Sequence, residues 1–151
     1  MTQLFRKQRR TVDYLRGMVA LCGRVLLGWF FASQALQRID EWSSMVILVQ
    51  MKRVPFGQVS LGLSLIAMFF GSAGLVMGFQ TRFSAFVLAI CTSGWVLIAH
   101  DFWTIQDPVA RQSDFLTFSL GVAVIGGLLC LFASGGGQFS VDRLSGKPQP
   151  D

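Results

Sequence analysis

His100 and Asp101 are the most conspicuous of the few residues in this chain that carry chemistry of their own. Histidine titrates near neutral pH, so a neighbouring carboxylate suggests general acid–base catalysis or a hydrogen bond to a quinone. Adjacent residues on a helix point about 100° apart, however, so the two side chains do not form a ready-made dyad. We favour interfacial hydrogen bonding for this pair, with proton transfer or quinone contact as the alternative, and we assign no catalytic residue.

Arg24 is the one fixed charge well inside a long apolar stretch. Its side chain can reach back to the headgroup surface as a topology anchor, or it can pair with a lipid phosphate or an acidic group on a partner. Tryptophans are typical of membrane interfaces, and those at deeper positions can contact lipid or a ring-shaped ligand. We predict contact with lipid or quinone for Arg24, Trp29, Trp95, His100 and Trp103.

Metal binding and thiol redox chemistry find no support in the residue pattern. The single histidine has no second histidine and no cysteine pair as fellow ligands. We interpret the three isolated cysteines, Cys22, Cys91 and Cys130, as small buried hydrophobes. No metal and no tightly bound cofactor are expected, and a quinone is the one cofactor that we consider.

Four long apolar stretches must position these residues. The uncharged stretches are residues 54–81, 83–100 and 115–141, and residues 17–37 would be a fourth but for Arg24. A helix of about 20 mostly apolar residues crosses a bilayer core of roughly 30 Å. Only 14% of the residues are charged, against about 25% in an ordinary soluble domain. The chain is therefore predicted to be an integral membrane protein.

The expected fold is all-α, a bundle of four transmembrane helices. The spans cover roughly residues 17–39, 56–79, 83–103 and 115–134. An interfacial amphipathic helix is expected between the first two spans, at about residues 41–51. Its apolar residues recur at helical spacing, as on a helix that lies along the outer interface: Trp42, Met45, Val46 and Val49.

Basic residues set the expected orientation of the membrane domain, residues 16–144. A basic arm precedes it at residues 1–15, and a flexible tail follows at residues 145–151. Eight lysines and arginines fall on the side of the two termini and four on the other side, which predicts that both termini are cytoplasmic. The net charge of +5 thus reflects topology, and we exclude nucleic acid as a partner. Four arm residues offer a docking site for anionic lipid or an acidic partner: Arg6, Lys7, Arg9 and Arg10.

Small residues recur at helical spacing in the second and fourth spans. Helices in lipid associate through close backbone packing at such positions, because apolar burial hardly drives their association. We predict helix packing at Ala67, Gly71, Gly74, Gly78, Gly126 and Gly127. The contact is either within one chain or between chains.

Four groups of motifs, in register along residues 23–144, resemble the DoxX family. They are the segment 24–28 with Ser33 and Gln37-Arg38, the turn at 78–85, the loop motifs at 100–103 and 106–112, and the glycine pair at 126–127 with the ending at 137–143. The resemblance implies a four-helix protein of the bacterial inner membrane, and the family is linked to quinone-coupled sulfur oxidation and thiol redox complexes. The family often has Glu near the position of Met68 and Lys-Asn near Leu120 and Gly121. These apolar replacements weaken every catalytic interpretation.

We therefore expect a non-catalytic integral membrane subunit or scaffold of a larger complex of respiratory or photosynthetic type. The alternative is the membrane component of a quinone-linked oxidoreductase that uses Arg24 and His100 with a soluble partner. A small-solute transporter is the third hypothesis, and it is disfavoured because the spans hold few ionisable groups. The expected partners are membrane lipids and other membrane subunits or a second copy, in the bacterial inner membrane.

Overall fold

The computed structural model describes residues 2–54, 56–137 and 139–141, and side chains within this part except those of residues 2–11 and 13. All regular structure in this part is helical: α1 (Thr2–Asp40), α2 (Trp42–Met51), α3 (Gly57–Met77), α4 (Thr81–Ala99) and α5 (Pro108–Ser134). Four segments are long and apolar enough to cross a membrane: Tyr14–Asp40, Gly57–Met77, Thr81–Ala99 and Pro108–Ser134. The predicted all-α fold, with four spans and a short helix between the first two, is confirmed.

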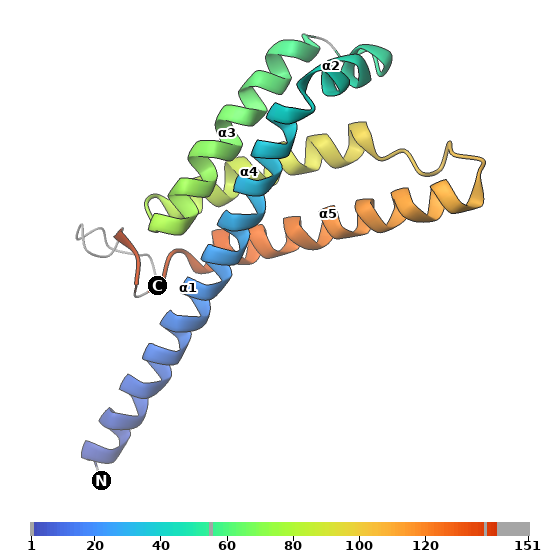
Figure 1. The fold of residues 1–151 in the computed structure, drawn as a ribbon. Coiled ribbons are helices and arrows are strands. Elements are labelled where there is room, and N and C mark those ends of the chain that lie inside the picture. Colours follow the sequence, from blue (N-terminus) through green and yellow to red (C-terminus); the bar gives the residue numbers. More distant parts are fainter. Residues whose placement is uncertain (1, 55, 138, 142–151) are drawn as a thin grey trace.

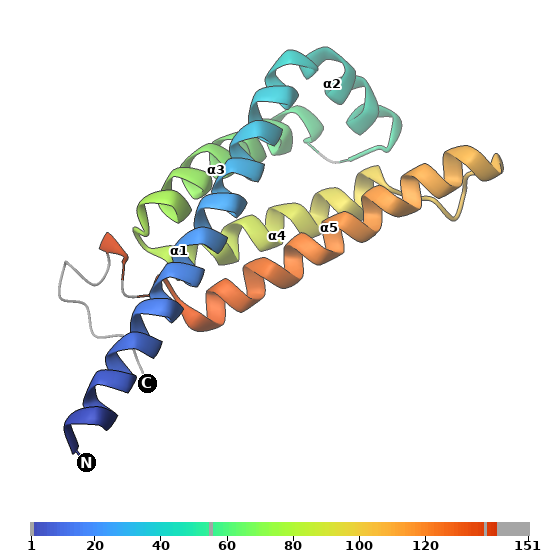
Figure 2. The same cartoon turned by 60° about the horizontal axis from the view of Figure 1, so that its bottom comes forward.

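The four long helices form two pairs, α1 with α3 and α4 with α5, and α3 also packs on α4. Figures 1 and 2 show α1 passing α5 near the C-terminal end of α5 and diverging from it toward α2 and the α4–α5 connection. The two pairs are therefore splayed at one end of the molecule. This end holds the cleft described below.

Helix α1 is longer than its span, because it begins at Thr2 and runs without a break to Asp40. The basic arm is thus the first part of this helix, and Figure 1 shows that it projects beyond the rest of the bundle. The tail at residues 145–151 lies outside the described residues.

A sharp turn ends α3, and a side-chain cap begins α5. Helix α3 ends at Gly78, whose φ of 70° suits a residue without a side chain, and the amide of Phe79 donates back to the carbonyl of Gly74 at 3.0 Å. Helix α5 begins with Pro108 in its first turn, and the Asp107 carboxylate accepts from the amide of Ala110 at 3.1 Å. These caps stop α3 sharply and fix where α5 starts.

Close approach of the helices depends on glycines that face a neighbouring helix. A side chain at Gly28 would meet Val76 of α3, and one at Gly121 would meet Val96 of α4. In the same way Gly71 faces Leu88 across the α3–α4 contact. The central core beside these contacts consists of Phe31, Ala35, Met68, Leu75, Ala85, Leu88, Ala89, Leu128 and Leu131.

The small residues predicted to pack have different surroundings. Gly71 and Gly74 face α4 of the same chain, and Gly78 forms the turn. A Cβ atom added at Gly127 would lie 3.9 Å from Leu27 of α1, whereas one added at Gly126 would have no atom within 4 Å. Ala67 is half-buried beside the α3–α4 contact. Gly71, Gly74 and Gly127 are thus used for packing within the chain.

The cysteines do not all lie in the protein core as expected. Cys22 and Cys130 are exposed on the surface of their helices, and Cys91 is half-buried. A thiol on the outer face of a membrane span contacts acyl chains. A weakly polar side chain is therefore kept from water there without being buried in protein. All three are free thiols.

Candidate functional site

A cavity of about 100 Å³ lies between the two helix pairs, near the splayed end, and all four long helices contribute to its lining. This central cleft has apolar walls that include Phe30, Phe31, Met68, Val96 and Leu120. Its polar lining residues are Gln34, Arg38, Thr92, His100 and Thr117. The volume is several times that needed for one water, about 10–15 Å³, and well below the pockets of 300 Å³ or more typical of drug-sized ligands.

Helical periodicity explains how these residues meet. The α1 residues Phe30, Gln34 and Arg38 are four apart, so they form one stripe along that helix. The α4 residues Thr92 and Trp95 are three apart, and Val96 lies one turn beyond Thr92, so they share a second stripe. Each helix thus turns one face into the cleft.

Arg38 is a buried cation in the lining of the cleft. Only 6% of this residue is exposed, and its guanidinium carbon lies 4.0 Å from the centroid of the Trp95 ring. Among the described residues no carboxylate lies within ion-pair distance of it. A cation–π contact contributes about 2 kcal/mol when desolvated, whereas burying an ion costs several kcal/mol. The ring therefore compensates only part of the cost of burying this charge.

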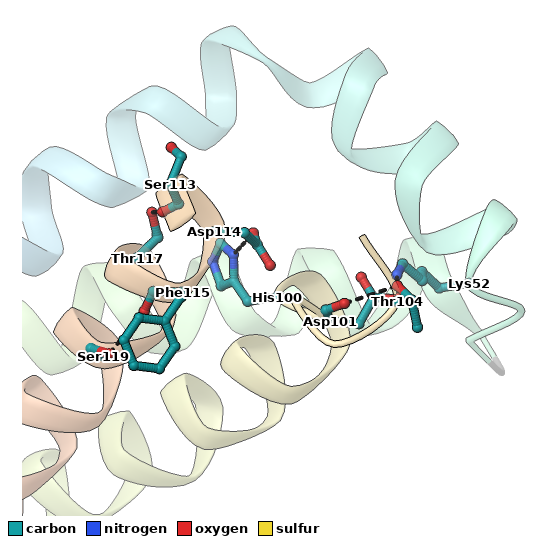
Figure 3. A network of polar contacts seen from close by, with 9 residues as sticks. All are labelled: Lys52, His100, Asp101, Thr104, Ser113, Asp114, Phe115, Thr117 and Ser119. Atoms are coloured by element: carbon teal, nitrogen blue, oxygen red, sulfur yellow. Dashed lines mark hydrogen bonds and ion pairs between the residues drawn. The ribbon is translucent and has the colours of Figure 1, made fainter. Parts of the chain in front are cut away.

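His100 forms its hydrogen bond with Asp114 rather than with its neighbour in sequence. Figure 3 shows the pair, with Nδ1 of His100 2.8 Å from Oδ1 of Asp114. The α4–α5 connection turns back so that a residue two turns into α5 lies opposite the end of α4. Both side chains are about one-fifth exposed, and within the described part of the chain Oδ2 of Asp114 has no hydrogen-bond partner.

Asp101 pairs instead with Lys52, which follows α2, at 2.5 Å between Nζ and Oδ2 (Figure 3). The bridge connects the α2 end of the first helix pair with the loop of the second pair. The hydrogen bond from Lys52 holds the pKa of the Asp101 carboxyl below its usual value. The expectation that His100 and Asp101 do not act as a dyad agrees with this arrangement.

The five residues predicted to contact lipid or quinone are only partly brought together. Trp95 and His100 line the central cleft. Trp29 is 73% exposed on the outer face of α1, and Trp103 is 59% exposed in the α4–α5 connection, so both present their rings to the surroundings of the bundle. Arg24 lies elsewhere, and contact of any of the five with lipid or quinone stays a prediction.

Arg24 is enclosed by protein at the end of the bundle where α5 ends. It is fully buried, and its guanidinium donates to the carbonyl oxygen of Phe139 at 2.6 Å. A side chain at Gly78 would collide with the same guanidinium. Arg24 therefore ties α1 to the segment after α5.

Sequence reasoning missed Gln34, Arg38 and Asp114. Arg38 was counted among the charges outside the membrane, because the first span was expected to end nearby. The stripe of Phe30, Gln34 and Arg38 was the available signal. No sequence spacing reveals Asp114, because its contact depends on how the α4–α5 connection folds back.

The predicted docking residues of the arm lie on the first turns of α1, but their side chains are outside the described part of the structure: Arg6, Lys7, Arg9 and Arg10. Within the described residues no group of three histidine, cysteine, aspartate or glutamate side chains is placed to hold a metal ion.

Comparison with known proteins corrects the family. The model of the SURF4 family matches residues 6–147. The chain is also 37% identical over 73 residues to "Uncharacterized protein T02E1.7" of Caenorhabditis elegans, an alignment that covers 47% of this chain and 26% of that protein. The chain thus spans about a quarter of the length of this curated relative. No solved structure matches the chain.

The assignment to the DoxX family was wrong. It rested on short motifs within residues 23–144, and motifs of this length do not separate one group of four-helix membrane proteins from another. The family match runs over residues 6–147 and takes in residues 6–15 of the basic arm, which the DoxX resemblance left out. The chain belongs to the SURF4 family.

Proposed function

We propose that this multi-pass membrane protein is a non-catalytic subunit or scaffold whose central cleft holds a membrane-resident molecule. The observation that supports the proposal is the buried Arg38, which lines a cavity built from all four spans without a carboxylate in ion-pair distance among the described residues. Buried charges in membrane proteins are costly and usually functional. A cation kept at such a position favours a binding role.

The bacterial inner membrane, the quinone link and the respiratory or photosynthetic complex rested on the DoxX resemblance, and they lose that support. The helices and the family match support a membrane protein with four apolar helices. The proposal therefore names a binding role in the membrane and leaves the assembly unnamed.

A quinone-linked oxidoreductase component is the second candidate, and one observation favours it. His100 lines the cleft while its Nδ1 is hydrogen-bonded to Asp114, and a carboxylate that orients a histidine is common in general acid–base sites. The apolar residues around the cleft, among them Met68 and Leu120, offer no further proton-transfer groups.

Site-specific photocrosslinking in native membranes tests the proposal. A photoreactive residue at Gln34 faces the cleft, whereas one at Leu26 lies two turns away on the same helix at a position 63% exposed. We expect a discrete adduct from Gln34 and only bulk phospholipid adducts from Leu26, as identified by mass spectrometry.

Identical adducts from the two positions would contradict a binding cleft. The oxidoreductase hypothesis is tested separately with purified protein in nanodiscs. Turnover of a quinone that is lost on His100→Ala would overturn the non-catalytic proposal.

A further inference from the structure

The guanidinium of Arg38 is arranged to accept an anion. Its carbon lies 4.0 Å from the centroid of the Trp95 ring, and this cation–π contact leaves the in-plane N–H groups of the guanidinium as donors still to be satisfied. Those in-plane donors match the two oxygens of a carboxylate or a phosphate.

The other polar groups of the cleft do not supply a counter-charge. The hydroxyl of Thr92 donates to the Leu88 carbonyl of its own helix, and that of Thr117 donates to the Ser113 carbonyl. Asp114 does not line the cavity, and the Oδ1 atom of its carboxylate is bound to His100. Within the described residues, the charge of Arg38 is thus left for a molecule from outside the chain.

The depth and size of the cleft restrict that molecule. Arg38 is two residues from the end of α1, about 3 Å along the axis, which is the level of lipid headgroups when α1 spans a bilayer. The walls toward the middle of the span are apolar, with Phe31 and Met68 buried there. About 100 Å³ admits a headgroup with the start of one acyl chain, and a two-chain lipid is too large.

We propose that the cleft binds the anionic head group of a single-chain amphiphile, an inference that rests on the proposed binding role of the cleft. The carboxylate or phosphate oxygens contact Arg38, and the acyl chain runs between the helix pairs. Fatty acids and lysophosphatidates both present this chemistry. Gln34 faces the same cavity and offers its amide to the head group. Recognition of the charge by Arg38 is what separates such ligands from neutral lipids.

Binding is measured with the full chain in nanodiscs of neutral phospholipid, with Trp95 as the reporter after Trp29, Trp42 and Trp103 are changed to Phe. Oleate and oleoyl lysophosphatidate are the two anionic probes, and methyl oleate is the uncharged control. We expect saturable changes in Trp95 fluorescence with one or both anionic probes and at least tenfold weaker binding of methyl oleate, because a charge-assisted hydrogen bond is lost.

Arg38→Gln should weaken the anionic probes about tenfold or more while leaving methyl oleate unchanged. Arg111→Gln is the matched control, since this arginine near the start of α5 is exposed and does not line the cavity. Arg38→Lys keeps the charge without the planar donors, and it should bind between the parent and Arg38→Gln.

Equal binding of oleate and methyl oleate would overturn the anion site, as would parent-like affinity in folded Arg38→Gln. The stronger anionic probe decides between carboxylate and phosphate as the source. If the photoreactive residue at position 34 crosslinks to a neutral lipid or to a polypeptide, the cleft remains a binding site and only the anionic amphiphile is excluded as its ligand. If Gln34 yields no discrete adduct, the proposed function itself fails.

Discussion

Arg38 illustrates how a single buried charge can weaken a fold and serve a site. Its cation–π contact with Trp95 contributes about 2 kcal/mol, less than the several kcal/mol that a buried ion costs. An apolar side chain of similar length avoids that cost. The residue is therefore better explained by binding than by stability.

Arg38→Leu is expected to keep or raise the Tm of delipidated protein in detergent, because it removes an uncompensated buried charge. Phe31→Ala is the comparison, since this core side chain is 1% exposed and its loss leaves a cavity that should lower the Tm clearly. Thermal unfolding of the parent and both variants measures the effect. A loss in Arg38→Leu as large as that in Phe31→Ala would make Arg38 a structural residue.

The Lys52–Asp101 bridge should depend on pH with a definite sign. The pKa of Asp101 is lowered in the folded protein by the hydrogen bond from Lys52. The contact is therefore fully present above the unfolded pKa, about 3.9, and is lost as the pH falls through the lower folded value.

Spin labels at the exposed Gln50 and Gln106 report this bridge, in a background without the native cysteines. We expect a narrow distance distribution from neutral pH down to about 4, and a broader one in more acidic solution. Lys52→Met should be broad already at neutral pH. Indistinguishable distributions for the parent and Lys52→Met at neutral pH would show that the bridge does not hold α2 near the loop.

At the scale of the helices, close packing is concentrated at particular glycines. Gly121 lies against Val96 of α4, whereas a side chain at Gly126 on the same helix meets nothing within 4 Å. Gly121→Leu should therefore separate α4 from α5 and destabilise the protein by about 1–3 kcal/mol, as overpacking does. Gly126→Leu is the matched control and should be close to neutral, as measured by unfolding in detergent. Equal losses in the two variants would contradict this packing.

Gly74 shows where reasoning from a sequence pattern stops. Its spacing predicted a helix contact without saying which helix, and the structure places it against Ser84 of α4 in the same chain. The short helix α2 was foreseen because Val49 and its neighbours form a stripe, and Val49 is indeed buried. The contacts between helices distant in sequence were not predicted, because they depend on crossing angles that a periodic pattern does not encode.

The cleft was out of reach of sequence reasoning for the same reason. Trp95 and His100 were singled out one by one, but their proximity to Arg38 follows from the splaying of two helix pairs. The family error has a related cause. Short motifs near turns record local geometry, which different families of four-helix membrane proteins can share.

The two ends of the whole molecule differ in construction. At one end Arg24 and the segment after α5 hold the helices together, so α1 and α5 lie close. At the other end the pairs diverge, and the Lys52–Asp101 contact bridges them. Arg38 lies two residues before the end of α1, so a ligand that entered from the splayed end would meet it near the start of its path. The side of the membrane that this end faces thus decides which molecules can reach it.

The positive-inside rule predicts that the splayed end faces away from the cytoplasm, since eight basic residues lie on the side of the termini and four on the other. Ser44 of α2 and Ser134 at the end of α5 are exposed at opposite ends of the bundle, and each is changed to cysteine in a chain whose native cysteines are alanine. In sealed vesicles with the cytoplasmic face outward, a membrane-impermeant maleimide should label Ser134→Cys at once and Ser44→Cys only after detergent is added. Immediate labelling of Ser44→Cys with protection of Ser134→Cys would invert the topology, and the cleft would then receive its ligand from the cytoplasmic side.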